Sequence, residues 1–361
     1  MHNIYLQKLK LINYRNFEDF EISISNKPIL LLGENGSGKT NILEAISLFS
    51  PGRGLRSAKL EEMCRAGSNQ SIVNVLMQSK LGLVEITTHL QRETARRHTE
   101  FNGTKIQNNE LAKLSTIIWL TPQMDGLFGA GISERRKFFD RIVYNFIPSH
   151  AIAVSKYEHY MLERSKALIQ EYNDTNWLKI VEEKMAELSV EITINRLNII
   201  KQMQRAIDYL DNNFPKAILS ICGAIEDKIL TSSKEEVCHF IANELLSSRS
   251  RDKISRRANF GVHRSDFIVV HREKNVVARL CSTGEQKSML ISLMLAQVNH
   301  AIKENISSPI LLLDEVFVHL DNRRKQYLAD YFLSIGLQIW VTGTDLSGIE
   351  MLEPKSELIR L

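Results

Sequence analysis

Four apolar segments predict strands that are buried on both faces of a sheet. Residues 28–32, 117–120 and 308–313 are continuous apolar runs, and residues 338–345 fit a fourth strand with its following loop. Continuous rather than alternating apolar runs are typical of parallel strands covered by helices on both sides. The chain is therefore expected to be an α/β protein.

Alternating segments predict a second, antiparallel β-structure. Residues 4–32 alternate enough to form a hairpin that leads into the first buried strand. Residues 72–77 and 83–88 are rich in β-forming residues, and the dipeptide Asn102-Gly103 is typical of a hairpin turn.

A long helical segment interrupts these strands. Residues 133–246 contain few glycines and prolines, with Pro148 and Pro215 at expected helix boundaries. As two antiparallel helices it would span at most about 85 Å at roughly 1.5 Å per residue, which favours a compact lobe over a long rod. We expect a head formed by residues 1–125 and 256–361, with the helical lobe at residues 126–255.

The first buried strand runs into a phosphate-binding loop of the form G-x-x-x-x-G-K-[ST], and a helical pattern follows. Glycines let backbone N–H groups approach phosphate oxygens, and the helix N-terminus adds partial positive charge. The lysine would reach the β- and γ-phosphates of ATP, and the threonine hydroxyl would bind Mg²⁺. A glycine-rich turn with a chance lysine is the alternative. The candidate ligands are Gly33, Glu34, Asn35, Gly36, Ser37, Gly38, Lys39 and Thr40.

A second buried run ends in two adjacent carboxylates, Asp314 and Glu315. Asp314 is expected to hold Mg²⁺, and Glu315 to polarise the water that attacks the γ-phosphate. The alternative is a helix N-terminus whose acids favour the helix dipole. Leu320-Asp321 then occupies the place of the D-loop of ABC ATPases.

The segment Ser282-Thr283-Gly284-Glu285-Gln286 precedes a helical pattern over residues 287–302. It resembles the signature loop with which an ABC-type ATPase grips the nucleotide held by its partner subunit, and we expect Ser282, Gly284 and Gln286 to make those contacts. Ser282 and Glu285 also fit a simple capping box, which is compatible with that function. ABC transporters place a histidine after the next strand, where this chain offers Thr342 and Thr344. Because the histidine is missing, we expect slow hydrolysis of ATP.

Charge and composition limit the classes of protein to which this chain could belong. The 361 residues are 43% hydrophobic with a net charge of +4, and no apolar run reaches the roughly 18 residues of a membrane helix. Neither a secretory leader nor a C-x-x-C pair is visible, so reduced thiols and a cytoplasmic location are expected. Clusters of basic residues favour binding to DNA phosphates, although each is also compatible with a solvated surface. The candidate contacts are Arg53, Arg56, Arg256 and Arg257.

Taken together, the chain resembles the RecF family of bacterial recombination-mediator ATPases, which are related to SMC proteins. The resemblance covers essentially the whole length and includes residues 9–17, 50–57, 135–140 and 261–266 besides the phosphate and signature loops. It implies an ABC-type ATPase head, with a mixed sheet and a flanking antiparallel sheet, plus an inserted, mainly α-helical lobe. Two departures are Gln123, where the family has Glu, and Ser265, where it has Asp. Gln123 is the residue that ABC ATPases use near Mg²⁺.

The resemblance implies a function as well. It implies a weak, DNA-stimulated ATPase that acts as a nucleotide switch: ATP drives homodimerisation around duplex or gapped DNA or single-stranded junctions, and hydrolysis releases it. RecR and RecO would be partners in recombinase loading, replication restart and the SOS response. One alternative is an ABC transporter ATPase subunit, but this chain lacks the earlier signature and the histidine of that family. Another is an SMC-like nuclease, which would need a further acidic metal cluster.

Overall fold

The computed structural model describes residues 4–79, 81–169, 175–210, 213–304 and 308–361. The chain divides into two compact units. Unit 1 comprises Met1–Asp125, Leu210–Pro215 and Thr283–Leu361, and unit 2 comprises Gly126–Tyr209 and Lys216–Ser282. Each unit is described separately below.

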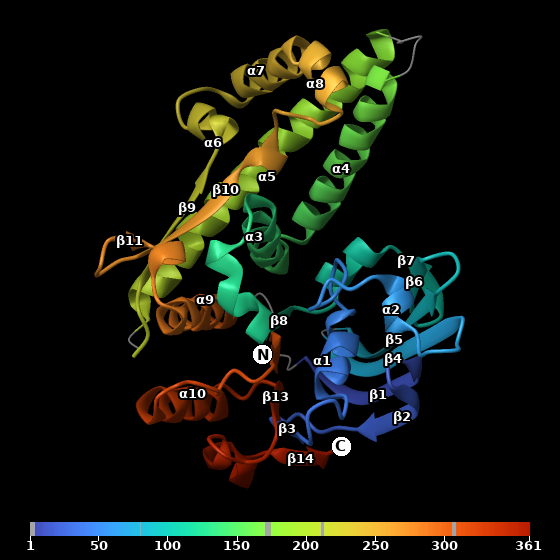
Figure 1. Cartoon of the computed structure of the whole chain (residues 1–361), viewed down its shortest axis with the longest axis vertical. Coiled ribbons are helices and arrows are strands. Elements are labelled where there is room, and N and C mark those ends of the chain that lie inside the picture. Colours follow the sequence, from blue (N-terminus) through green and yellow to red (C-terminus); the bar gives the residue numbers. More distant parts are fainter. Residues whose placement is uncertain (1–3, 80, 170–174, 211–212, 305–307) are drawn as a thin grey trace. The chain divides into compact units, whose positions relative to one another are not determined.

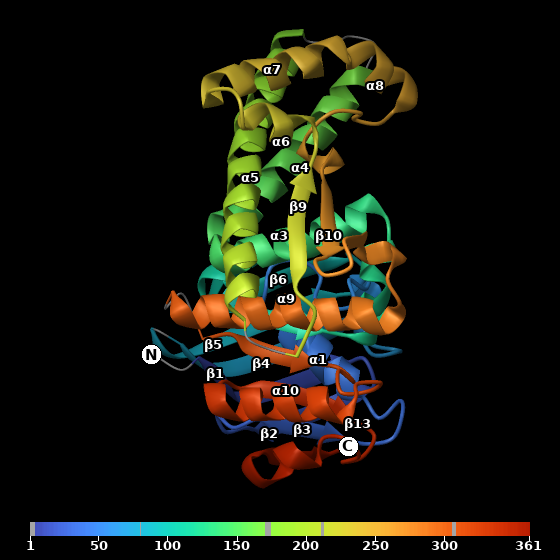
Figure 2. The same ribbon diagram turned by 90° about the vertical axis from the view of Figure 1, so that its left-hand side faces the viewer.

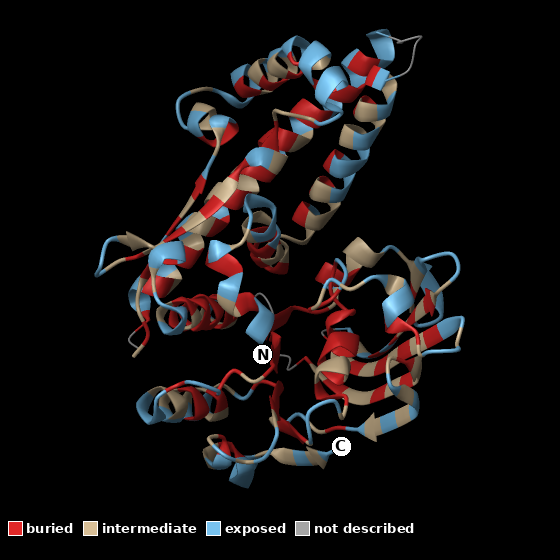
Figure 3. Cartoon of the chain, viewed as in Figure 1, coloured by how far each residue is buried: buried red, intermediate tan, exposed pale blue. Residues whose placement is uncertain are grey.

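Unit 1 contains a five-stranded sheet in the order β14-β3-β13-β12-β8, in which every neighbouring pair is parallel. The predicted apolar runs form all of its strands except β14 and are buried along nearly their whole length, because helices and a second sheet surround them (Figure 3). The ABC-type head fold that the sequence predicted is confirmed, although the sheet expected to be mixed is wholly parallel and the antiparallel pairs of unit 1 lie in a separate sheet. The strands are β3 (Ile29–Leu32), β8 (Ile117–Leu120), β12 (Ile310–Leu313), β13 (Ile339–Gly343) and β14 (Glu357–Arg360).

The second sheet of unit 1 has six antiparallel strands in the order β2-β1-β4-β5-β6-β7. Burial alternates along β4 and β5, as expected for strands with one face on the core. The predicted turn joins β6 to β7, with Asn102 and Gly103 at φ of 47° and 76°. The strands are β1 (Tyr5–Tyr14), β2 (Phe17–Ser23), β4 (Gln70–Ser79), β5 (Gly82–Gln91), β6 (Arg96–Phe101) and β7 (Thr104–Ile106).

In the described part of unit 1, helices flank the two sheets (Figure 1). The most buried is α9, which packs against β8 and presents apolar residues on nearly every side to its surroundings. The helices are α1 (Lys39–Ser47), α2 (Leu60–Met63), α9 (Thr283–Lys303) and α10 (Asn322–Ile335). Short 3₁₀ segments of the chain lie at Asn108–Lys113, Pro122–Gly129, Val262–Arg264, Ala278–Leu280 and Glu350–Lys355.

Unit 2 is the predicted helical lobe, but it also holds a small sheet in the order β11-β10-β9. Figure 2 shows β9 running alongside the long helix α5, with β10 beside β9. Because β9 lies within the segment expected to be helical and pairs with β10, the unit extends to Ser282 and not to residue 255. Its elements are α3 (Ile132–Phe146), α4 (Pro148–Ile169), α5 (Thr175–Tyr209), β9 (Ala217–Cys222), α6 (Ala224–Ile229), α7 (Lys234–Ser247), α8 (Arg249–Ser255), β10 (Asp266–His271) and β11 (Val276–Val277).

Buried ion pairs tie the helices of unit 2 together. Arg196 of α5 donates to both carboxylate oxygens of Asp140 on α3, each at 2.8 Å, and His150 contacts the same carboxylate at 3.0 Å. A second pair joins Arg164 of α4 to Asp252 of α8 at 2.7 Å. Since each charge is nearly fully buried, removal of either partner would leave an uncompensated charge in the interior. Among the described residues, no helix of either unit is long and apolar enough to cross a membrane.

Candidate nucleotide site

The phosphate loop connects the end of β3 to the start of α1, as the sequence predicts. Gly36 and Gly38 adopt φ of 88° and 111°, a region that side chains with a Cβ rarely occupy. A Cβ on Gly38 would lie 2.6 Å from Phe17 Cζ and 2.8 Å from Asn16 Nδ2, so the β1–β2 turn packs directly against the loop. A Cβ on Gly36 would meet nothing within 4 Å. The loop is therefore braced on one side and open on the other.

The phosphate loop places an ammonium group and a hydroxyl group where a phosphate could contact them. The Lys39 ammonium is buried and donates to the carbonyl oxygens of Gly33 at 2.6 Å and Glu34 at 2.8 Å. The Ser37 hydroxyl is buried without a hydrogen-bond partner in the described part of the chain. A cavity of about 440 Å³ opens beside the loop, within the usual range for small-molecule sites. These groups fit a polyphosphate. The cavity is lined by Leu32, Gly33, Glu34, Asn35, Ser37, Thr344, Arg360 and Leu361.

The carboxylate pair meets the end of the loop. Asp314 accepts hydrogen bonds from the Thr40 hydroxyl at 3.1 Å and from the Thr342 hydroxyl at 2.8 Å. Burial raises the pKa of Asp314, while these two hydrogen bonds oppose the rise. Oxygen donors of this kind are those that Mg²⁺ prefers, so Thr40 and Asp314 fit a magnesium ion bound with a nucleotide.

Thr342 has a role that sequence reasoning missed. It is buried, and its hydroxyl accepts a hydrogen bond from the backbone N–H of Glu315 at 2.9 Å while donating one to Asp314 at 2.8 Å. Glu315 itself adopts a φ of 50°, so its backbone lies in the left-handed region. One threonine thus positions both acidic residues. The strand pattern alone could not have shown this, because it does not say which neighbouring strand end a hydroxyl faces.

A buried carboxylate behind the loop anchors α1 to the antiparallel sheet. Glu44 has no solvent exposure and accepts two hydrogen bonds from Arg15, at 2.7 Å each, and one from Tyr14 at 3.1 Å. Arg56 lies 3.8 Å from the same carboxylate and donates to Asn41 at 2.7 Å. Arg56, a candidate DNA contact from the sequence, is therefore partly engaged beside the phosphate loop.

The signature segment is divided between exposed and buried residues. Ser282 and Gly284 are exposed where α9 begins, and a Cβ on Gly284 would meet nothing within 4 Å. Gln286 is buried at 8% exposure. Gln123, expected near Mg²⁺, follows β8 and is exposed. The first residues of the signature are thus available to a second molecule.

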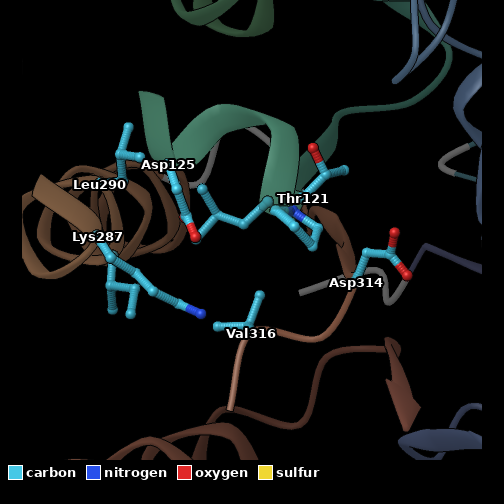
Figure 4. A pocket seen from close by; sticks show the side chains of 9 residues that line it. Thr121, Asp125, Lys287, Leu290, Asp314 and Val316 are labelled. Carbon is cyan, nitrogen blue, oxygen red and sulfur yellow. The ribbon is translucent and has the colours of Figure 1, made fainter. Parts of the chain in front are cut away.

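The lysine that closes the signature reaches the loop after the acidic pair. Lys287 donates to the carbonyl oxygen of Val318 at 2.7 Å. Figure 4 shows Lys287 and Asp125 pointing into a small cavity of about 10 Å³, with Asp314 at its far end. Burial lowers the pKa of Lys287, while Asp125 and Glu315 act to raise it.

The basic clusters separate into exposed and structural members. Arg53, Arg256 and Arg257 are exposed. Arg97, in contrast, is half-buried, donates to the carbonyl oxygen of Gly52 at 2.9 Å, and has a pKa lowered to about 10 by desolvation. Arg249 is paired with Glu182 at 2.6 Å. Exposure therefore leaves three of the four predicted DNA contacts free for a ligand.

Comparison with known proteins identifies the family. The family described as RecF/RecN/SMC N terminal domain matches residues 5–357. The "DNA replication and repair protein RecF" of Rickettsia bellii (strain RML369-C) is 58% identical over 100% of both chains. That of Rickettsia felis (strain ATCC VR-1525 / URRWXCal2) is 58% identical over 100% of this chain and 99% of its own.

Solved structures agree on the fold. A structure of the recombination mediator protein RecF in the RecFOR pathway, in its RecF-ATPrS form, has a TM-score of 0.84 with 24% identity over 96% of this chain and 95% of its own. The RecF-ATP form has the same score and identity over 95% and 93%. An Smc head domain from Pyrococcus furiosus is more distant, with a TM-score of 0.53 and 15% identity over 96% and 92%. From the match along nearly its whole length and from relatives 58% identical over all of it, this chain belongs to the RecF family, within the RecF/RecN/SMC N-terminal domain family.

Proposed function

We propose that this protein is an ATP-dependent DNA-binding switch of recombinational repair and replication restart. The observation that carries the proposal is that one chain contains both complementary parts of an ABC-type nucleotide site. The phosphate loop and acidic pair form one face of a nucleotide site, while Ser282 and Gly284 are exposed at the start of α9. The positive end of a helix dipole suits a γ-phosphate held by a second copy. ATP would therefore drive homodimerisation.

The side chains suit phosphoryl transfer by positioning. Lys39 would exchange its two carbonyl partners for phosphate oxygens, and Thr40 and Asp314 would hold Mg²⁺, which neutralises charge on the phosphates. Glu315 would polarise the attacking water, with its backbone held by Thr342. With a threonine in place of a transporter-type histidine, we expect turnover below the roughly 10 s⁻¹ of typical enzymes.

The ligand and partners follow from the family and from the basic residues. Arg53, Arg256 and Arg257 are exposed and suited to DNA phosphates. The relatives are named for DNA replication and repair and for the RecFOR pathway, which favours DNA as the ligand of this protein. We propose in addition that the DNA is duplex or gapped, that it stimulates the ATPase, and that the protein acts in the cytoplasm with RecO and RecR during recombinase loading and the SOS response. The exposed candidate arginines predict binding that weakens as salt rises.

A substitution in the signature tests the dimer. Ser282→Arg should abolish ATP-dependent binding of a gapped duplex, because a long cation would block the approach of the partner's γ-phosphate. Fluorescence anisotropy of the labelled duplex, with and without ATP, measures this effect. Thr94→Arg adds the same charge at an exposed turn and should leave binding intact. If the Ser282→Arg protein still bound the gapped duplex in an ATP-dependent way, the dimer model would be wrong.

A second substitution tests the positioning threonine. Thr342→Val keeps the side-chain shape but removes the hydroxyl that holds Asp314 and Glu315. We expect steady-state ATP hydrolysis to fall about 10–100-fold, as for other residues that orient metal ligands. Thr193→Val is the matched control, because its hydroxyl is also buried but has no partner in the described structure. Equal rates for the two variants would contradict the role of Thr342.

A further inference from the structure

Two histidines and a glutamate gather on one face of the antiparallel sheet, in a place that the nucleotide chemistry does not use. His89 on β5 lies directly opposite His98 on β6, and Glu100 follows two residues after His98 on the same strand. Residues two apart on a strand point to the same face. The side chains of all three are about one-third exposed, at 30%, 32% and 35%. They form a cluster that solvent can enter from one side.

The donor atoms of this cluster lie close together. Nε2 of His89 and Nε2 of His98 are 3.7 Å and 3.9 Å from the two carboxylate oxygens of Glu100. One donor atom from each residue lies within 4.8 Å of the others. A tetrahedral zinc ion with bonds of about 2.0–2.1 Å holds its ligand atoms about 3.3–3.4 Å apart. Small side-chain rotations would therefore bring the three donors to metal distance.

We propose that His89, His98 and Glu100 form a site for one zinc-class divalent ion, which bridges β5 and β6. Two imidazoles and one carboxylate are a donor set that zinc uses, and imidazole nitrogens disfavour Mg²⁺. The exposed side leaves room for water as the fourth ligand. Because the donors come from two strands, the ion would fasten the β5–β6 ribbon.

Another explanation is a plain cross-strand contact. The imidazole rings stack with centroids 4.5 Å apart and an interplanar angle of 8°, and stacked pairs stabilise strand pairing without a metal. Lys105, opposite Glu100 on β7, would also oppose a cation. The two explanations differ in what they predict for zinc affinity.

Calorimetric titration of the chelator-stripped full chain with ZnCl₂, in buffer containing excess Mg²⁺, separates the explanations. We expect one ion per chain at micromolar affinity or better, and a loss of at least about 100-fold in His98→Ala, since removal of a ligand exceeds the 10–100-fold effect of removing its supporting residue. Glu100→Gln should weaken binding as well. His159→Ala removes an exposed histidine of unit 2 and should have no effect. All variants should keep their far-UV circular dichroism.

Two further readouts guard against other sites. Zinc should raise the melting temperature of the wild-type protein but not of His98→Ala, because only a native-state ligand stabilises the fold. Co²⁺ should give a visible spectrum without a thiolate charge-transfer band, which excludes the exposed Cys222. Unchanged zinc binding in His98→Ala, a thiolate band, or no binding at 100 µM ZnCl₂, about a hundred times the affinity limit of ~1 µM, would each overturn the proposal.

Discussion

Glu315→Gln is expected to reduce ATP hydrolysis by about 10²–10⁴-fold, the range for loss of a general base. Its backbone N–H is held by Thr342, and the amide has nearly the shape of the carboxylate, so ATP should still bind. We therefore expect the variant to accumulate as an ATP-bound dimer that holds gapped DNA. Single-turnover hydrolysis and size-exclusion chromatography with ATP measure the two effects.

Lys39→Met is expected to have the opposite effect on ATP binding to that of Glu315→Gln. Lys39 is buried and places its ammonium within the phosphate loop, where methionine offers no charge. We expect ATP binding itself to be lost, together with dimerisation and DNA binding. Anisotropy of a gapped duplex titrated with each variant, at two salt concentrations, compares them directly. If Glu315→Gln and Lys39→Met behaved alike, the assignment of Glu315 would fail.

Arg196→Met is expected to destabilise unit 2 by about 3–5 kcal/mol, because it leaves the buried carboxylate of Asp140 without its main partner. The double variant Asp140→Leu with Arg196→Met should be closer to the wild type, since no buried charge is then left unpaired. Amide hydrogen exchange along α5 localises the effect to this unit. As a control, Lys184→Met breaks the exposed pair with Glu187 and should change protection little. Equal protection loss in the single and double variants would contradict this prediction.

The same pair predicts a dependence of stability on pH. Burial alone would raise the pKa of Asp140, but the charge of Arg196 and the hydrogen bonds from His150 and Arg196 outweigh it and hold that pKa well below its usual range. The unfolded state therefore takes up the proton first as pH falls. The contribution of Asp140 is fully present above its unfolded pKa of about 3.9 and is lost progressively below it. Urea unfolding between about pH 5 and 3 should show this loss in the wild type and less of it in the double variant.

Patterns in the sequence were sufficient to predict those features that are formed by residues adjacent in the chain. The apolar runs that became β3, β8 and β12 were predictable because a strand covered on both faces needs an unbroken apolar run. The phosphate loop, the acidic pair and the signature were predictable because each needs fixed residue types at fixed spacing. The family resemblance rests on these same segments and is confirmed by the relatives.

Tertiary structure decided what depends on residues far apart in the chain. Thr342 meets Asp314 and Glu315 only because β12 and β13 end at one edge of a parallel sheet. The strand β9 exists within a helical segment because β10 supplies its partner. The exposure of Arg53 and the partial burial of Arg97 likewise follow from packing, since the two side chains carry the same charge. The sequence by itself predicts the nucleotide-binding motifs and the family of this protein, and only the folded chain decides which side chains position the residues of those motifs, because hydrogen bonds and burial are set by distance in space.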